Sequence, residues 1–158
     1  MKNLEKKIQF LLNLYKEKKL PKAESLNKEL LKEYPNVVIL YNILGLILTD
    51  QEKTNEAIAC YENGLKINPN YSMIYNNLGG IYQNKEEYNL AEKYYKKSIN
   101  LDSKIAEPQN NLGNLYLKIN KYSEAVTCYE KAIKINPRFP IFYYNLGVVY
   151  KNIGKIDE

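Results

Sequence analysis

The stretch YNNLGGIY at residues 75–82 contains a leucine–glycine pair that returns at a fixed interval along the chain. The pairs end at Gly45, Gly79, Gly113 and Gly147, each 34 residues after the one before. A constant period without insertions is typical of stacked supersecondary units, each of which buries its apolar face against its neighbours. The period therefore predicts a repeat protein, in which binding uses an extended surface and not a single catalytic point.

Other residues keep the same register relative to each glycine. Tyrosine stands four positions before three of the glycines, and the first three are followed by alanine at twelve positions and tyrosine at sixteen. The members of this pattern are Tyr41, Tyr75, Tyr143, Ala57, Ala91, Ala125, Tyr61, Tyr95 and Tyr129. The earlier positions of a unit share one face of a helix with 3.6 residues per turn, and the later ones share a face of a second helix. Pro35, Pro69 and Pro137 are expected to end the second helices, because proline cannot donate a backbone hydrogen bond.

This pattern resembles the tetratricopeptide repeat, a unit with conserved aromatic, Leu-Gly, alanine and proline positions. The resemblance implies an all-α fold, a right-handed superhelical solenoid of antiparallel helix pairs with about nine helices. We assign the whole chain, residues 1–158, to a single solenoid domain. Its predicted units are a degenerate repeat at 4–37, full repeats at 38–71, 72–105 and 106–139, and a half repeat at 140–158. Because the sequence stops before the alanine of a fifth unit, the chain is interpreted as a fragment of a longer protein.

The composition argues against a catalytic or metal site. The chain has no histidine, which removes the usual general base, the usual partner of a nucleophile and the commonest zinc ligand. Cys60 and Cys128 occupy the same position in units two repeats apart, a separation that a disulfide does not span. Both are expected to be unpaired thiols in a reducing compartment. We expect these residues to form no enzyme site and to bind no cofactor or metal.

Charge and hydropathy favour a protein or peptide partner. The net charge is +5, but the lysines are spread along the predicted second helices and form no contiguous basic stripe, so nucleic acid is not an expected partner. No apolar segment is long enough to cross a membrane, and the N-terminal segment lacks the small-residue cleavage site of a signal peptide. We therefore expect a cytoplasmic protein.

The first helices of tetratricopeptide proteins line the concave face, and here their exposed stripe is rich in amides. The predicted peptide-binding residues of this groove are Asn42, Asn76, Asn77, Gln83, Asn84, Asn110, Asn111, Asn114 and Asn145. Asparagine is a poor helix former, so several on one helical face suggest a use beyond helix formation. Each amide offers both a donor and an acceptor, which suits the backbone of an extended peptide of any sequence.

Asn77, Asn111 and Asn145 each precede Leu-Gly. They resemble the asparagine ladder in the repeat domain of O-linked N-acetylglucosamine transferases, in which such residues hold the backbone of the substrate peptide. Asparagines also occur outside the predicted groove, as at Asn55 and Asn63, so a general enrichment of the sequence in asparagine is the alternative explanation.

The favoured function is a non-catalytic protein–protein interaction module that binds an extended peptide segment in its concave groove. Two alternatives stay open. In the first, the chain is the substrate-recruiting N-terminal arm of a larger glycosyltransferase- or sulfotransferase-type enzyme. In the second, it is a self-assembling scaffold, because the half repeat has no second helix of its own to cover its apolar side chains, and an open end of this kind can pair with another copy. These side chains are Ile141, Phe142, Tyr143, Val149 and Tyr150.

Overall fold

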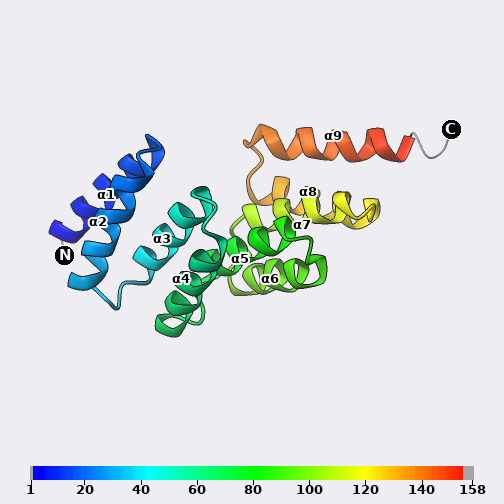
Figure 1. Cartoon of the computed structure of the whole chain (residues 1–158). Coiled ribbons are helices and arrows are strands. Elements are labelled where there is room, and N and C mark those ends of the chain that lie inside the picture. The colour runs from blue at the N-terminus through cyan, green and yellow to red at the C-terminus, as the bar shows by residue number, and fades with distance from the viewer. Residues whose placement is uncertain (1, 155–158) are drawn as a thin grey trace. The chain divides into compact units, whose positions relative to one another are not determined.

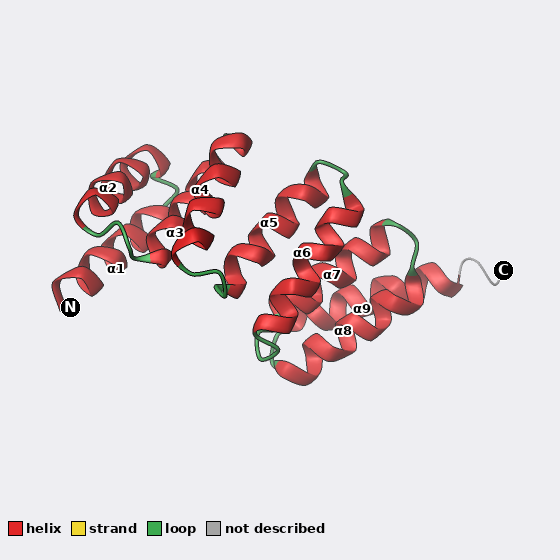
Figure 2. Cartoon of the chain, turned by 90° about the horizontal axis from the view of Figure 1, so that it is seen from below, coloured by secondary structure: helices red, strands yellow, loops and turns green. Residues whose placement is uncertain are grey.

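The computed structural model describes residues 2–154, which form nine α-helices and no strand. In chain order these are α1 (Lys2–Lys16), α2 (Leu20–Glu33), α3 (Val38–Asp50), α4 (Thr54–Ile67), α5 (Ser72–Asn84), α6 (Tyr88–Leu101), α7 (Glu107–Lys118), α8 (Tyr122–Ile135) and α9 (Pro140–Gly154) (Figure 1). Short loops join the helices (Figure 2). The predicted all-α architecture of helical repeats is thus confirmed.

The chain divides into two compact units, the first ending at Ile74 and the second beginning at Tyr75. The first contains α1 to α4, and the second contains most of α5 together with α6 to α9. Each unit is built from helices that pack on their neighbours in sequence, such as α3 on α4 and α7 on α8. The assignment of the whole chain to a single solenoid domain stays a prediction.

A tyrosine of the second helix lies against the glycine of the first helix in the pairs α3–α4, α5–α6 and α7–α8. A Cβ atom added to Gly79 would lie 2.6 Å from the ring of Tyr95, and one added to Gly113 would lie 2.8 Å from the ring of Tyr129. Gly45 faces Tyr61 in the same way. Glycine inside a helix costs about 1 kcal/mol relative to alanine. Packing explains why glycine recurs in these three helix pairs: a side chain at this position would occupy the space of the buried ring.

The turn between the two helices of a pair also repeats. Lys18, Glu52, Glu86 and Asn120 have φ angles of 56°, 63°, 62° and 60° and lie 34 residues apart. The N–H of Glu52 donates to the carbonyl of Thr49, and the next N–H donates to the carbonyl of Leu48. These two bonds close a Schellman motif, which usually has glycine in the left-handed position. Each non-glycine residue held there costs roughly 1–2 kcal/mol.

The core of the second unit extends into α9. Val149 is fully buried in a cluster with residues of α7 and α8, and Phe142 is 2% exposed in a smaller cluster with Ala106 and Ala132. The expectation that Phe142 and Val149 are uncovered is therefore wrong: these side chains point toward the preceding helix pair. Ile141, Tyr143 and Tyr150 are exposed, as expected.

Candidate functional site

Asparagine side chains join one helix pair of the second unit to the next. Asn111 Nδ2 donates to Asn76 Oδ1 over 3.0 Å, and Asn145 Nδ2 donates to Asn110 Oδ1 over 2.8 Å. Both bonds connect residues 35 positions apart, so the same link is made twice, from α7 to α5 and from α9 to α7. The link repeats because Asn145 lies one 34-residue repeat after Asn111, and Asn110 lies one repeat after Asn76.

Two further hydrogen bonds complete a continuous chain of amides. Asn110 Nδ2 donates to Asn111 Oδ1 at 3.4 Å, and Asn145 Nδ2 also donates to Asn114 Oδ1 at 3.3 Å. All five side chains are half-buried. We call this set the amide row; it consists of Asn76, Asn110, Asn111, Asn114 and Asn145. Because each amide is held by its neighbours, the row presents its remaining polar atoms in fixed directions.

Buried tyrosines of the second helices donate hydrogen bonds to amide side chains of the first helices and so orient them. The hydroxyl of Tyr129 donates to Asn114 Oδ1 over 2.7 Å, and the hydroxyl of Tyr95 donates to Gln83 Oε1 over 2.9 Å. Burial raises the pKa of both tyrosines above its usual value, so each hydroxyl keeps its proton at neutral pH. The same rings fill the space beside the helical glycines. In the α5–α6 and α7–α8 pairs, the tyrosine that packs against the glycine thus also fixes the direction of an amide.

Part of the hydrogen-bonding capacity of the row is unused. Among residues 2–154, no acceptor takes a hydrogen bond from Asn76 Nδ2 or Asn114 Nδ2, and no donor reaches Asn145 Oδ1. An amide that receives a hydrogen bond on its oxygen keeps two N–H groups for another acceptor. The row therefore offers donors at its two ends, Asn76 and Asn114, and an acceptor at Asn145, with no formal charge.

The other predicted groove residues divide into two groups. Asn77, Gln83 and Asn84 lie on α5; the first two are half-buried and the third is exposed. Asn42 differs, since it lies in α3 of the first unit and is 4% exposed. The expectation that Asn42 stands on an exposed stripe is not met, because α3 is apolar on most of its surface and is buried along most of its length. The amide row belongs entirely to the second unit.

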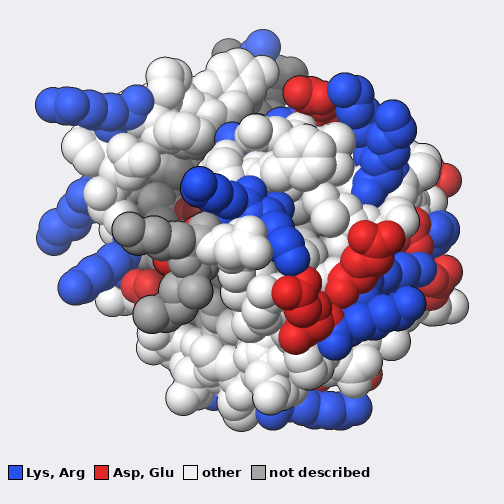
Figure 3. All heavy atoms as spheres, turned by 90° about the vertical axis from the view of Figure 1, so that its left-hand side faces the viewer, with Lys and Arg blue, Asp and Glu red and all other residues white. Residues whose placement is uncertain are grey.

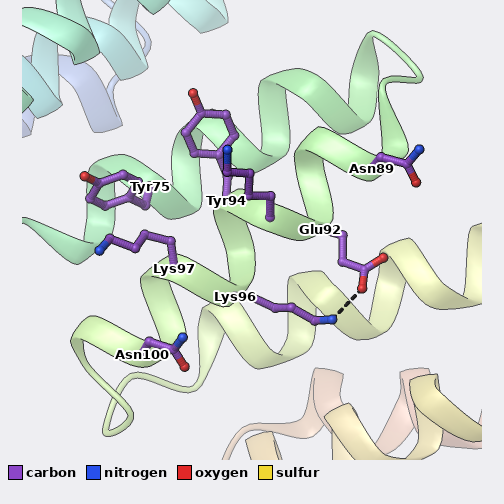
Figure 4. Close-up of a pocket in the computed structure, with 8 residues that line it drawn as sticks. Tyr75, Asn89, Glu92, Tyr94, Lys96, Lys97 and Asn100 are labelled. Atoms are coloured by element: carbon purple, nitrogen blue, oxygen red, sulfur yellow. Dashed lines mark hydrogen bonds and ion pairs between the residues drawn. The ribbon is translucent and has the colours of Figure 1, made fainter.

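A second feature, which shares no residue with the predicted groove, is a hollow of about 660 Å³ beside α6. It is lined by Tyr75, Asn89, Glu92, Lys93, Tyr94, Lys96, Lys97 and Asn100. Figure 4 shows Tyr75, Tyr94 and Lys97 at one end and the Lys96–Glu92 ion pair nearer the other. The unusual residue in the sequence is Tyr94, which stands where the neighbouring units have Cys60 and Cys128.

Some of the side chains that line this hollow contact one another. Lys96 is paired with Glu92, and the Lys97 ammonium lies 5.9 Å from the centre of the Tyr75 ring. Tyr94 stacks on Tyr82 with the ring centres 5.2 Å apart. These contacts stabilise the α5–α6 pair. The amide row, with its unused donors and acceptor, is the better candidate for binding.

The described residues contain none of the usual features of a metal or reactive thiol site. In residues 2–154, no three Cys, Asp or Glu side chains are grouped so that they could hold a metal ion. Cys60 and Cys128 are free and buried, and burial raises their pKa values to about 12 and about 11. Thiols with such pKa values are poor nucleophiles at neutral pH, because the reactive species is the thiolate.

Charged side chains of both signs are mixed on the surface of the described residues (Figure 3). On the face drawn in Figure 3, lysine and arginine side chains are interrupted by acidic and uncharged ones. Among the described residues, lysines pair with acidic side chains at Lys7–Glu33 and Lys18–Asp50, for example. From α1 to α9, no helix combines the length and the apolar character that a membrane span requires.

Comparison with protein families gives two matches along the chain. The family model described as "TPR repeat" matches residues 45–85 and 113–154, and the one described as "Tetratricopeptide repeat" matches residues 74–105. No curated protein matches the sequence.

Solved structures resemble this chain over most of its length. The crystal structure of MamA is 25% identical, with a TM-score of 0.74, and the match covers 90% of this chain and 83% of MamA. TTC0263, a thermophilic TPR protein of Thermus thermophilus, is 21% identical with a TM-score of 0.80, and the match covers 89% of this chain and 77% of TTC0263. The pilF protein of Pseudomonas aeruginosa is 19% identical with a TM-score of 0.84, and the match covers 96% of this chain and 70% of pilF. The last two likenesses bear on the fold alone.

Proposed function

Because the chain belongs to the tetratricopeptide repeat family, whose fold is typical of protein–protein interaction modules, we propose that its second unit binds the backbone of an extended peptide along the amide row. The observation that carries this proposal is the chain of hydrogen bonds from Asn76 to Asn114, which leaves two amide donors and one acceptor of half-buried side chains unused.

Backbone recognition follows from the chemistry of the row. A peptide backbone offers one N–H and one C=O per residue, and an amide side chain complements both. Asn76 Nδ2 and Asn114 Nδ2 are suited to peptide carbonyls, and Asn145 Oδ1 is suited to a peptide N–H. None of these atoms carries a formal charge, so the row has no preference for acidic or basic peptides. The bound segment is therefore selected by its extended shape and by side chains that meet the surface beside the row.

Because the amides of the row are already ordered, each contact with the peptide contributes more to binding. A free asparagine loses side-chain entropy when it is fixed by a ligand, at a cost of about 0.5–1.5 kcal/mol. In the amide row that ordering is already present, because each amide is held by an asparagine or by the Tyr129 hydroxyl. Each hydrogen bond to the peptide then contributes more of its roughly 0.5–1.5 kcal/mol to binding.

The test follows the side-chain amide signals in nuclear magnetic resonance spectra of the nitrogen-15-labelled chain. The probes are two capped peptides of unrelated sequence, one rich in serine and threonine and one rich in alanine and glutamine, each of about 12 residues and so roughly 40 Å long when extended. We expect both peptides to shift the NH₂ signals of Asn76 and Asn114, while those of Asn55 and Asn63, which are exposed outside the row, stay in place.

Methylation of the peptide nitrogens gives the matched control. A peptide of the same sequence with alternate N-methyl groups keeps its side chains and its carbonyls and loses backbone donors, so it should lose the bond to Asn145 Oδ1 and bind several-fold more weakly. If neither unmodified peptide shifts the Asn76 and Asn114 signals at millimolar concentration, backbone recognition by the amide row is ruled out; if the methylated peptide binds equally well, the bond from a peptide N–H to Asn145 is ruled out.

A further inference from the structure

Helix α9 has a largely uncovered apolar face. Eight large apolar side chains are exposed among the described residues, and five of them lie in or beside this helix. They are Phe139, Ile141, Tyr143, Tyr144 and Tyr150. Lys151 is the one charged residue in the sequence from Pro140 to Gly154. An exposed, nearly uncharged helix face of this kind marks an interaction surface.

The α3–α4 pair of the first unit shows how such a face is covered in this protein. Two tyrosine–glycine contacts run in opposite directions across the pair: the ring of Tyr61 on α4 lies against Gly45 on α3, and Tyr41 on α3 lies against Gly64 on α4. A Cβ atom added to Gly64 would be 2.9 Å from Tyr41 Cβ. Each helix thus places a tyrosine against a glycine of the other, by its ring at Gly45 and by its Cβ atom at Gly64, where the side chain of Ile74 also approaches.

Helix α9 has both the tyrosines and the glycines of such contacts along one side of the helix, which we call the stripe. Tyr143, Gly147, Tyr150 and Gly154 are separated by four, three and four residues, which keeps them on the same side of the helix. Tyr143 is 49% exposed and Tyr150 is 52% exposed. A Cβ atom added to Gly147 or to Gly154 would meet nothing within 4 Å. Both rings and both glycines are therefore uncovered.

We propose that this stripe is a docking surface for a second copy of the same chain, with the two α9 helices antiparallel. In the register that places Tyr150 of one copy opposite Gly147 of the other, Tyr143 falls opposite Gly154, because both pairs are centred on the same point between residues 148 and 149. One two-fold axis then forms both tyrosine–glycine contacts twice. Such an interface uses the same patch on both copies and closes as a dimer.

The low charge of α9 also favours a second copy over an unrelated partner. A two-fold interface brings each charge near its own equivalent, and a strongly charged helix would repel itself. Lys151 lies next to the stripe at its C-terminal end, and no other charged side chain accompanies it between Pro140 and Gly154. This surface is separate from the amide row, so dimerisation does not depend on the function proposed above.

The experiment measures the molar mass of the full chain by sedimentation equilibrium over a wide range of concentrations. We expect a monomer–dimer equilibrium for the unchanged chain. Gly147→Ala should raise the dimer dissociation constant at least tenfold, because the added methyl group occupies the space of the Tyr150 ring of the second copy. The monomer itself has room for that methyl group. Tyr150→Ser should weaken the dimer to a similar extent by removing the ring.

Two matched variants make the result specific to the stripe. Gly80→Ala adds the same methyl group to a glycine of α5 at which the nearest side-chain atom, Tyr95 Oη, lies 3.8 Å from the added Cβ, and Tyr144→Ser removes an exposed ring of α9 that lies outside the stripe. Neither should change the dissociation constant by more than about twofold. The proposal is overturned if the unchanged chain stays monomeric at the highest concentration, if it grows beyond a dimer, or if Gly147→Ala and Gly80→Ala have equal effects.

Discussion

The hydroxyl of Tyr129 donates a 2.7 Å hydrogen bond to Oδ1 of Asn114, so a buried side chain of α8 orients a surface amide of α7. The ring of the same tyrosine lies against Gly113. One residue therefore both packs between the two helices and orients an amide of the row that we propose to bind peptide. Changes in this contact should affect stability and peptide binding separately, depending on which part of the tyrosine is altered.

Removal of the Tyr129 hydroxyl should weaken peptide binding more than it weakens the fold. Tyr129→Phe keeps the ring over Gly113 and leaves the Asn114 amide held only by the longer, 3.3 Å bond from Asn145, so we expect peptide affinity to fall about threefold to tenfold, the equivalent of one hydrogen bond. Isothermal titration calorimetry with the serine- and threonine-rich peptide measures this change. Tyr122→Phe is the matched control, since the Tyr122 hydroxyl bonds to Asn120 at an exposed turn. Equal losses from the two variants would contradict a role for the Tyr129–Asn114 bond.

A methyl group at Gly113 should destabilise the second unit. Gly113→Ala gains about 1 kcal/mol of helix propensity but forces the buried Tyr129 ring to move, and overpacking a tight contact costs about 1–3 kcal/mol. The ring is fully buried and its hydroxyl is hydrogen-bonded, so it has little freedom to move, and we expect a net loss. Gly80→Ala, where the added Cβ has room, should raise the urea midpoint measured by circular dichroism. A gain in stability from both changes would show that the packing explanation of the repeated glycine is wrong.

Glycine at the left-handed turn between α3 and α4 should stabilise the first unit. Glu52 has a φ angle of 63°, and glycine reaches this conformation without the roughly 1–2 kcal/mol penalty of an L-residue. Because glycine also makes the unfolded chain more flexible, the expected net gain is about 0.5–1 kcal/mol. Thermal unfolding of Glu52→Gly should be compared with that of Glu56→Gly, an exposed position inside α4 at which glycine should cost about 1 kcal/mol. A loss of stability from Glu52→Gly would contradict this account of the turn.

The first unit should lose stability in acid through Glu24. Hydrogen bonds from Lys28 and Lys53 lower the pKa of this carboxylate to about 2, and the Lys53 contact ties α2 to the start of α4. The pKa in the unfolded chain is near 4.3, so the stabilisation is complete above about pH 5 and is lost as the pH falls toward 2. Glu24→Gln should therefore be less stable than the unchanged chain at pH 7, by on the order of 1 kcal/mol after solvent screening of the exposed lysines. Urea unfolding at pH 7 and at pH 2.5 should show this difference shrinking in acid; a difference that stays constant would argue against the ion pairs.

The repeat architecture could be predicted because it depends on spacing alone. The 34-residue interval between glycines, with a tyrosine sixteen residues after each of the first three, determines which residues face each other, and the structure brings Gly79 to Tyr95 and Gly113 to Tyr129 as this interval requires. The left-handed turn at Lys18, Glu52, Glu86 and Asn120 could not be found in the same way. Its positions have the same period, but none of them holds the glycine that normally marks such a turn.

The amide row was predicted in part. Helical spacing placed Asn76, Asn110 and Asn111 on one face, but spacing cannot tell whether amides point to solvent or to one another, and the bond between Asn111 and Asn76 depends on the distance between packed helices. The spacing of residues also does not show which positions neighbouring apolar residues will bury. For this reason Asn42 was expected at the surface, although it lies in the interior. At α9, spacing did not show that Phe142 and Val149 pack toward the preceding helices while Tyr143 and Tyr150 are exposed.

The most direct test of the account is the affinity of the capped peptides for a chain in which Asn76, Asn114 and Asn145 are all changed to alanine. These three side chains carry the unused donors and acceptor of the amide row, and three lost hydrogen bonds should weaken binding of both peptides by about one to three orders of magnitude. The same change at Asn55, Asn63 and Asn89, which are exposed outside the row, should leave both affinities within about twofold. Equal effects of the two triple variants would contradict the claim that the amide row holds peptide backbone.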